Sequence, residues 1–326
     1  MGDFLFWRKY NYGIGYNMII LKDEEIKSHV NYRIGGKADH LVIVENEKEL
    51  IGAISDLGKK RSPFFVLGSG TNVLFGDKNF KGTIIKIGLK EVKEREDGLF
   101  VSSGVPMAEL LDLCLENGLS GLEWAGGLPG TVGGAIRGNA GAFGGEIKDS
   151  VFEVKSLVFE GGEPILKARK NTECLFGYRD SIFKHNGEII LSAVFTLAKR
   201  DKGEMNGEIN KYILYRKEHQ PLEYPSAGST FKNIPLDSVS QEVAEEFKAV
   251  IKNDPFPVIP VAAVLDRLGL KGKELGGAQI SGKHPNFFIN KNNASFDDII
   301  GLINLAKEKA LEKYGIVLKE EIEIIN

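Results

Sequence analysis

The stretch GGLPGTVGGAIRGNAGAFGG, residues 126–145, contains nine glycines in twenty residues. Glycine inside a helix or strand costs about 0.5–1 kcal/mol relative to alanine, so this much bare backbone requires a physical reason. One reason is a tightly packed crossing of two chain segments. The other is a cradle whose consecutive main-chain N–H groups bind a phosphate-bearing ligand without a basic side chain. The density of glycine, together with Thr131 and Asn139, favours the cradle.

Two further glycine-bearing turns occur earlier in the chain. VLGSGTNVLF (66–75) begins as an apolar strand and continues directly into its turn, the usual position of a phosphate-binding turn in an α/β unit. It departs from the Rossmann dinucleotide fingerprint because Val73 stands where the third glycine belongs. NYRIGGKAD (31–39) adds another pair of glycines before a strand. Three such turns predict one extended ligand of about dinucleotide size that touches several loops.

Composition limits the classes of function. The chain has 326 residues, a formal net charge of −3, 42% hydrophobic and 27% charged residues, which is typical of a globular protein of about two domains. It has no basic excess for nucleic acid or an anionic membrane, no apolar run of membrane-helix length and no signal-peptide core. The two cysteines and five histidines show no metal-ligand spacing. We therefore expect a cytoplasmic protein with no metal, nucleic-acid or membrane partner.

The first third of the chain alternates strand and helix signals, which predicts an α/β unit, and the middle third reads differently. A helix is expected over 47–60, and a second one between Pro106 and Gly118, because proline favours the start of a helix and glycine its end. Strands are expected at 40–44, 64–68, 83–88 and 99–104, with β-rich runs at 151–159 and 189–197.

The last third of the chain is predicted to be mostly helical. The polar segment 198–208 is interpreted as a linker. The last long helix is expected to begin with a capping box of Ser295 and Asp298 and to end at Gly315. A final strand over 316–325 alternates in hydropathy. One of its faces carries Lys319, Glu321 and Glu323, and the residues alone favour exposure of that face to solvent.

Arg179, in FGYRDSIF (176–183), has two interpretations. It forms a surface ion pair, for which the neighbouring Asp180 is the available partner, or its planar guanidinium binds a ligand carboxylate through two parallel hydrogen bonds. The residues alone favour the ion pair.

Two other segments carry candidate polar groups. QPLEYPSAGSTFKN (220–233) presents Ser229 behind a glycine, either as a loop hydroxyl that satisfies main-chain groups or as a proton donor. The segment has no GxSxG elbow and no nearby His–Asp set, which disfavours a hydrolase nucleophile. GAQISGKH (277–284) nearly matches a P-loop, but His284 stands where Ser or Thr would coordinate magnesium. A nucleoside triphosphatase is therefore disfavoured.

Taken in order, seven segments resemble the family of bacterial UDP-N-acetylenolpyruvoylglucosamine reductases (the MurB family), FAD enzymes of peptidoglycan synthesis. The resemblance runs from about residue 28 to the end of the chain. No single segment is decisive, but all of them in family order are highly specific. The segments are NYRIGGKAD, VLGSGTNVLF, GLPGTVGGAIRGNAGAFGGEI, YRDS, QPLEYPSAGSTFKN, AQISGKHPNFFIN and LKEEIEII.

The resemblance implies an α+β fold. Residues 18–203 are expected to form an FAD-binding domain of the vanillyl-alcohol-oxidase/PCMH type, built from two α/β subdomains at about 18–90 and 91–203. Residues 204–326 are expected to form a C-terminal α+β substrate domain, whose final strand at about 316–325 packs back on the first subdomain. Residues 1–17 are an aromatic-rich extension to which no role is given.

The resemblance also implies the reaction. NADPH reduces FAD, and the reduced flavin reduces UDP-N-acetylglucosamine enolpyruvate to UDP-N-acetylmuramate, a peptidoglycan precursor needed for cell wall biogenesis, cell shape and cell division. Arg179 matches the family arginine that stabilises the enolate charge where it develops. Ser229 matches the serine that donates a proton, and Lys232 lies close enough in sequence to assist. Glu321 matches the C-terminal glutamate that assists protonation or orients the enol.

The binding residues follow from the same motifs. The substrate contacts implied are Tyr178, Lys232, Asn233 and His284. FAD is expected to be bound without a covalent bond, because no histidine or cysteine lies in the glycine-rich turns. The FAD contacts implied are Gly35, Gly68, Ser69, Gly70, Thr71, Asn72, Gly127, Pro129, Gly130, Thr131, Gly133, Gly134, Asn139, Ala140 and Gly141.

The chain departs from the family pattern at its end. Glu323 stands where the family often has arginine, which removes a positive charge from an expected substrate contact and makes Glu320 the alternative to Glu321. Only 49 residues separate Arg179 from Ser229, as in the shorter subgroup that lacks an inserted substrate-covering loop. We expect a monomer. Two alternatives stay open: a flavin-dependent oxidase of the same fold, and a non-catalytic flavin or nucleotide-sugar binding protein.

Overall fold

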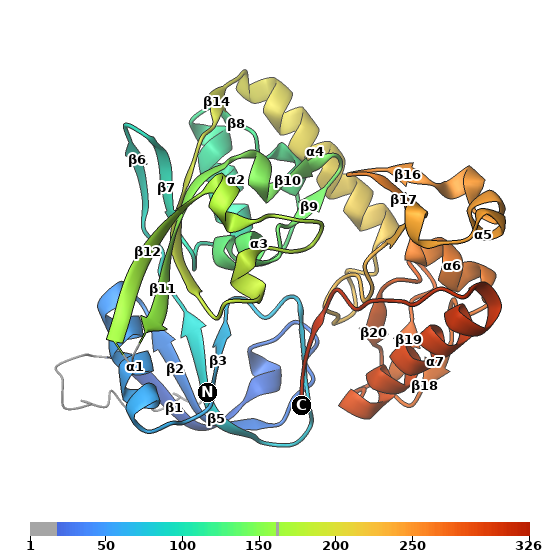
Figure 1. Cartoon of the computed structure of the whole chain (residues 1–326), viewed down its shortest axis with the longest axis horizontal. Helices are drawn as coiled ribbons and strands as arrows, with labels where there is room; N and C mark the ends of the chain where they lie inside the picture. The colour runs from blue at the N-terminus through green and yellow to red at the C-terminus, as the bar shows by residue number, and fades with distance from the viewer. Residues whose placement is uncertain (1–17, 161–162) are drawn as a thin grey trace, which may run out of the picture.

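The alternating signals of the first third build a four-stranded sheet with α1 (Glu47–Lys59) on one face, here called the first lobe. In this computed structural model, residues 18–160 and 163–326 are described (Figure 1), so the extension predicted at residues 1–17 lies outside them. Asn46 caps α1 by accepting the N–H of Glu49, and α1 buries Leu50 and Ile54 against the sheet. The strand order is β1 (Ile19–Glu25), β2 (Lys37–Val44), β5 (Phe80–Ile87) and β3 (Phe64–Leu67).

The second lobe is a five-stranded sheet with one face covered by α2 (Met107–Glu116) and α3 (Val132–Arg137). Its strands are antiparallel throughout. Their order is β12 (Glu163–Lys170), β11 (Val151–Glu160), β13 (Ile189–Phe195), β7 (Gly98–Ser102) and β6 (Val92–Arg95). Short pairs add β8 (Leu119–Ser120) with β14 (Ala198–Lys199), and β9 (Gly141–Ala142) with β10 (Gly145–Glu146).

The third lobe packs helices against two small antiparallel sheets around one hydrophobic cluster. Its long helix, α7 (Phe296–Tyr314), has the predicted capping box of Ser295 and Asp298 and ends at Gly315, whose φ is 65°. The other helices are α5 (Gln241–Glu246) and α6 (Val261–Arg267). The strands are β15 (Ile234–Pro235), β16 (Lys252–Asn253), β17 (Pro257–Ile259), β18 (Glu274–Leu275), β19 (Ala278–Ile280) and β20 (Phe288–Asn290).

The linker predicted at 198–208 is wrong. Its larger part belongs to α4 (Lys202–His219), which begins at Asp201, whose side chain accepts the N–H of Glu204. The segment has a polar composition because this helix buries only a few side chains, Met205 and Ile209 among them. As Figure 1 shows, α4 runs from the second lobe towards the third.

The end of the chain returns to the first half of the molecule (Figure 1). β21 (Glu323–Ile325) pairs in parallel with β4 (Val73–Phe75), immediately after the turn at 68–72. The strand predicted over 316–325 is therefore much shorter than expected. The alternation in hydropathy still holds, because Ile316, Leu318 and Ile322 are buried in the third lobe.

Tyr32 ties the first third of the chain to the third lobe. Its fully buried hydroxyl donates to the main-chain oxygen of Phe288 at 2.7 Å, and burial raises the pKa of this phenol. Asn290 donates back to the main-chain oxygen of Tyr32 at 3.1 Å. Tyr32 therefore belongs to the same hydrophobic cluster as α7.

We predict that Tyr32→Phe lowers the free energy of unfolding by about 1–3 kcal/mol, because it leaves the buried carbonyl of Phe288 without this donor. Urea unfolding measures the loss. Tyr224→Phe, which alters an exposed tyrosine, is the control. Equal midpoints for Tyr32→Phe and the control contradict the assignment.

Candidate active site

The two main glycine-rich segments lie against each other. A Cβ atom added to Gly68 would lie 2.7 Å from Oγ1 of Thr131, and one added to Gly130 would lie 3.0 Å from Oγ1 of Thr71. The third turn joins them, because the N–H of Asn31 donates to the main-chain oxygen of Gly70 at 2.9 Å. The three segments predicted to share one ligand therefore meet in space.

The turn at 68–72 offers free main-chain donors. In the described part of the chain, the N–H groups of residues 69–72 donate to no protein carbonyl. Gly70 has a φ of 68°, a conformation that turns successive N–H groups towards one side. The buried hydroxyl of Ser103, beside Gly133, also has no hydrogen-bond partner within the described residues. Neutral donors on bare backbone fit the pyrophosphate of a dinucleotide.

Two of the predicted FAD contacts have other surroundings. Asn139 is fully buried, donates to the main-chain oxygen of Gly177 at 2.9 Å and accepts the N–H of Lys148 at 3.1 Å. Its side chain therefore joins the glycine-rich stretch to the YRDS turn. Gly35 packs against Ile26 and against Phe75, the last residue of the segment 66–75, and its nearest neighbours do not include the turn at 68–72 or the stretch 126–145.

Arg179 and Glu321 form the central contact of the site. Nε of Arg179 donates to Oε1 of Glu321 at 2.9 Å, and Nη2 donates to the main-chain oxygen of Gly141 at 2.7 Å. Arg179 has a φ of 54°, and the ammonium of Lys184 donates to its main-chain oxygen at 2.7 Å. Nη1 of Arg179 has no hydrogen bond to the described part of the chain, so it is the nitrogen left for a ligand.

Ser229 and Glu321 are linked through Thr230, the residue that follows Ser229 in the sequence. The N–H of Glu321 donates to the main-chain oxygen of Thr230 at 2.8 Å, so the predicted proton donor is next to that contact in sequence. The amide of Asn72 donates to the main-chain oxygen of Glu321 at 3.1 Å. The structure thus brings Arg179 and Glu321 together beside the turn at 68–72, with Ser229 one residue away from the contact of Thr230 with Glu321.

The ion pair expected between Arg179 and Asp180 is wrong. Asp180 binds His185 at 2.9 Å instead, because the backbone turn at Arg179 directs the two neighbouring side chains to different partners. Glu320, the alternative to Glu321, accepts a hydrogen bond from Nζ of Lys307 on α7 at 2.6 Å, whereas Arg179 binds Glu321. The charge of Glu323 also has a protein partner, Arg137.

A cavity of about 980 Å³ opens beside Arg179. Of the four predicted substrate contacts, Tyr178, Asn233 and His284 line it, and Lys232 does not. The hydroxyl of Tyr178 accepts the N–H of Asn233 at 3.2 Å, and burial raises the pKa of this phenol. The cavity therefore has walls from both the second and the third lobe.

Helix α4 supplies a wall of the cavity that the sequence did not reveal. Arg216 is only 8% exposed, its Nε donates to the main-chain oxygen of Gly126 at 2.8 Å, and its buried Nη2 has no partner within the described residues. Burial lowers the pKa of Arg216. Tyr212 stacks on Phe143 with ring centres 4.2 Å apart. Arg216 and Tyr212 lie in no recognised motif, and the sequence analysis assigned the start of their helix to a linker at 198–208.

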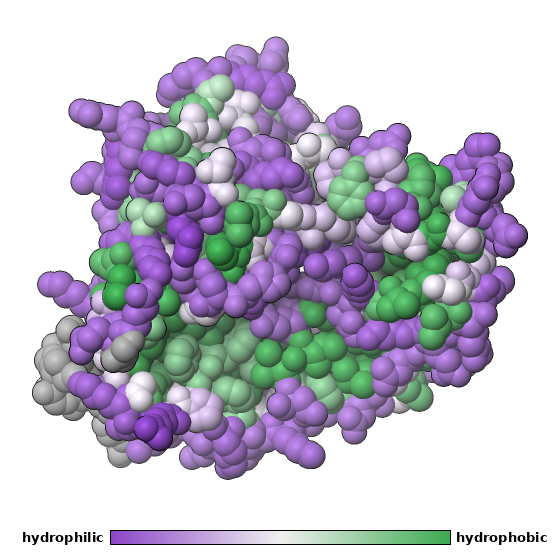
Figure 2. Space-filling model, in the orientation of Figure 1, coloured by the Kyte–Doolittle hydropathy of each residue, from purple (hydrophilic) through white to green (hydrophobic). Residues whose placement is uncertain are grey.

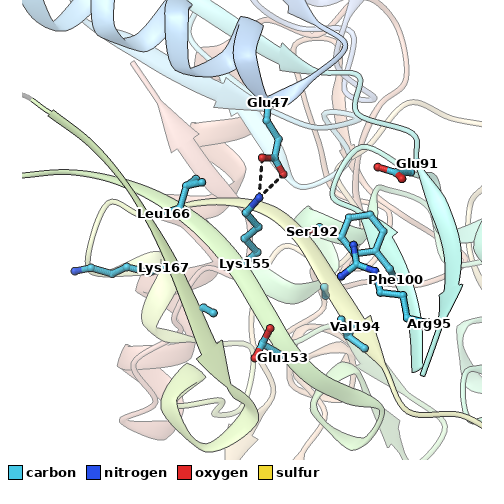
Figure 3. A pocket seen from close by; sticks show the side chains of 12 residues that line it. Glu47, Glu91, Arg95, Phe100, Glu153, Lys155, Leu166, Lys167, Ser192 and Val194 are labelled. Atoms are coloured by element: carbon cyan, nitrogen blue, oxygen red, sulfur yellow. Dashed lines mark hydrogen bonds and ion pairs between the residues drawn. The ribbon is translucent and has the colours of Figure 1, made fainter. Parts of the chain in front are cut away.

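A second hollow, of about 490 Å³, lies on the other face of the five-stranded sheet (Figure 3). Lys155 of β11 donates to both carboxylate oxygens of Glu47 on α1, at 2.7 and 2.9 Å. Arg95 lies over the ring of Phe100 at 3.8 Å. None of the predicted site residues lines this hollow, and it is not part of the candidate site.

Comparison with known families defines the class. Residues 38–165 match the FAD binding domain family, and residues 220–325 match the C-terminal domain of UDP-N-acetylenolpyruvoylglucosamine reductase. The first match covers two of the three glycine-bearing turns described above. The chain is therefore an FAD-binding protein, and the α+β fold class expected from the sequence is confirmed.

Individual relatives narrow the assignment to one family. The chain is 37% identical to the UDP-N-acetylenolpyruvoylglucosamine reductase of Syntrophomonas wolfei, over 93% of this chain and 94% of that protein. It is 38% identical to that of Thermotoga maritima, over 92% and 97%. The crystal structure of the reductase from Thermus caldophilus is similar with a TM-score of 0.73 and 28% identity, over 95% and 99%. The chain belongs to the UDP-N-acetylenolpyruvoylglucosamine reductase family, as the sequence resemblance predicted.

The described helices carry no membrane span. Across residues 18–160 and 163–326, every helix is too short or too polar to cross a bilayer.

His284, on the cavity wall, makes stability depend on pH. Burial lowers its pKa from 6.5 to about 4, with a further contribution from the charge of Lys252. Its Nδ1 is buried without a partner in the described part of the chain. Between pH 6.5 and about 4 the unfolded chain binds a proton at His284 that the folded chain does not, so the free energy of unfolding falls as the pH is lowered.

We predict that His284→Gln loses less stability than the wild type between pH 6.5 and 4, by up to about 3 kcal/mol at about 1.4 kcal/mol per pKa unit. Urea unfolding at both pH values measures the difference. His40→Gln, in β2, controls for the removal of a histidine elsewhere. The same pH dependence in His284→Gln and wild type contradicts the prediction.

Proposed function

We propose that this chain reduces UDP-N-acetylglucosamine enolpyruvate to UDP-N-acetylmuramate in the cytoplasm, with NADPH as reductant and FAD as bound cofactor. The observation that carries the proposal is the meeting of Arg179, Glu321 and the Ser229 loop beside the glycine-rich turns. Membership of the reductase family supports the same substrate. The product is a precursor for peptidoglycan synthesis.

The glycine-rich turns would hold FAD. The free N–H groups of residues 69–72 suit its pyrophosphate, and Gly130 and Gly133 allow close approach of the backbone. No cysteine or histidine lies in these turns, which supports non-covalent binding. Bound there, FAD would supply the transfer of a hydride from NADPH to the enolpyruvyl carbon remote from the carboxylate.

Arg179 stabilises the negative charge that hydride addition places on the substrate. Its Nε is occupied by Glu321 and its Nη2 by Gly141, so Nη1 is the donor available to the substrate carboxylate. These two protein contacts fix the plane of the guanidinium before substrate binds. A preorganised cation at the carboxylate lowers the free energy of the enolate as it forms.

Ser229 then donates a proton to the carbon next to the substrate carboxylate, which completes the reduction of the double bond. A serine hydroxyl is a weak acid, so positive charge nearby must stabilise the oxyanion that remains. Lys184 and Lys232 lie close enough for the charge of Lys232 to lower the pKa of Lys184, after the larger effect of burial. Glu321 orients the enol through its contact with Arg179.

The cavity beside Arg179 accommodates the rest of the substrate. Its volume of about 980 Å³ suits a nucleotide sugar. Lys211 and Lys252 on its wall supply positive charge for a diphosphate, together with the buried guanidinium of Arg216. We propose that Tyr178, Asn233 and His284 contact this part of the substrate.

One anaerobic titration separates the proposal from its rivals. The purified protein is expected to be yellow, to bleach with NADPH, and to regain its colour on addition of the enolpyruvyl sugar. A flavin-dependent oxidase stays bleached when the sugar is added and regains its colour when air is then admitted. A non-catalytic binding protein retains the bleached spectrum after the sugar is added. Either of these two results contradicts the proposed function.

We predict that Ser229→Ala slows flavin reoxidation by the enolpyruvyl sugar about 10²–10⁴-fold, because it removes the proton donor. Reduction of the flavin by NADPH is expected to stay within about twofold of wild type, since that step needs no proton from this group. Stopped-flow absorbance measures both rates. Ser226→Ala, in the same loop, is the matched control. Survival of both rates in Ser229→Ala removes Ser229 from the mechanism.

A further inference from the structure

Arg137 and Glu323 form an ion pair that the proposed mechanism does not use. Nη1 of Arg137 donates to Oε2 of Glu323 at 2.7 Å, and Nη2 donates to Oε1 at 3.2 Å. Two parallel hydrogen bonds of this kind fix orientation as well as distance. Arg137 is the last residue of α3 and Glu323 the first of β21, so the pair joins the glycine-rich stretch to the end of the chain.

Arg137 also contacts the segment that carries Arg179. The buried hydroxyl of Ser181 donates to the main-chain oxygen of Arg137 at 2.7 Å. Ser181 lies two residues after Arg179 in the YRDS turn. One residue of α3 therefore touches both segments whose side chains meet in the pair of Arg179 and Glu321.

Glu323 follows Glu321 by two residues, and the chain bends at residues 321–322 immediately before β21 begins. Hydrogen bonds with Thr230 and Asn72 hold the main chain of Glu321, whereas β21 itself has only three residues and, among the described strands, pairs with β4. The N–H of Glu323 donates to the main-chain oxygen of Asn72 at 2.9 Å. A strand this short is weakly held by its own hydrogen bonds, so a side-chain clamp at its first residue affects the position of Glu321.

We propose that Arg137 and Glu323 are positioning residues, which hold the C-terminal segment so that the Glu321 carboxylate stays on Arg179. This inference rests on the proposed function for its catalytic consequence. The pair neutralises Glu323 within the protein, so the negative charge at this position does not act on the substrate. The structure requires opposite charges at positions 137 and 323, and which of the two positions carries the positive charge does not matter.

The test uses two single variants, Arg137→Ala and Glu323→Ala, and the charge-swapped double variant Arg137→Glu/Glu323→Arg. Both side chains are partly exposed, 39% and 32%, so the fold is expected to tolerate these changes. Lys307→Ala is the matched control, because it breaks the ion pair of Lys307 with Glu320 in the same terminal segment.

Two measurements are made on each variant at equal FAD loading. Anaerobic stopped-flow absorbance gives the rates of flavin reduction by NADPH and of reoxidation by the enolpyruvyl sugar. Amide hydrogen exchange of the peptide 316–326 reports how firmly the C-terminal segment is held, whether or not the enzyme turns over.

In both single variants we expect reoxidation to slow about threefold to thirtyfold, with reduction by NADPH unchanged and faster hydrogen exchange in the terminal peptide. The swapped variant is expected to recover both properties to within about threefold of wild type. Lys307→Ala is expected to leave the reoxidation rate unchanged. This pattern distinguishes positioning from a general loss of stability.

Wild-type reoxidation rates in both single variants overturn the inference. A swapped variant as slow as the single variants also overturns it, because the charge itself and not the pairing then matters. If the sugar fails to reoxidise the wild-type enzyme, the proposed function is wrong, and hydrogen exchange of the peptide 316–326 then tests the positioning role by itself. Unchanged exchange in the single variants overturns the positioning role. Faster exchange in the single variants, with the wild-type rate recovered in the charge-swapped variant, supports it.

Discussion

The ion pair of Arg179 and Glu321 joins two segments that lie 142 residues apart, and the arrangement of the site depends on it. Three further parts of the chain contact this pair: Gly141 binds the guanidinium, and Asn72 and Thr230 bind the main chain of Glu321. Both side chains are mostly buried, 22% and 21% exposed, so the cost of removing the two charges from water offsets much of the attraction between them. Its importance is geometric, because it requires all three lobes to be in place.

Main chain and side chains have different roles in the site that this ion pair holds together. Bare backbone from the first and second lobes meets where the free N–H groups of residues 69–72 lie, which explains the cost of so many glycines. The charged side chains come from the second and third lobes and from α4, which form the cavity beside Arg179. Figure 2 shows hydrophobic residues gathered along the hollow between the first lobe, at the bottom of the view, and the rest of the molecule.

Local rules predicted much of the fold. The helix before Gly118 and the capping box of Ser295 and Asp298 depend on near neighbours, and both are confirmed. The partner of Arg179 is Glu321, which is far away in the sequence, so the neighbouring residues could not predict it. The residues alone favoured Asp180 as the partner. The family resemblance indicated that this arginine is catalytic. Neither the local sequence rules nor the family resemblance predicted Arg216, because α4 has a polar composition and the residues with which it lines the cavity follow no motif.

In the proposed mechanism, Glu321, held on Arg179, serves reduction of the sugar and not reduction of the flavin. Anaerobic stopped-flow absorbance of Glu321→Gln separates these two steps, because glutamine keeps the size of the side chain and removes its charge. We expect unchanged reduction by NADPH, with reoxidation by the enolpyruvyl sugar slowed at least about tenfold. Reoxidation at the wild-type rate would contradict it, and so would equal slowing of both steps.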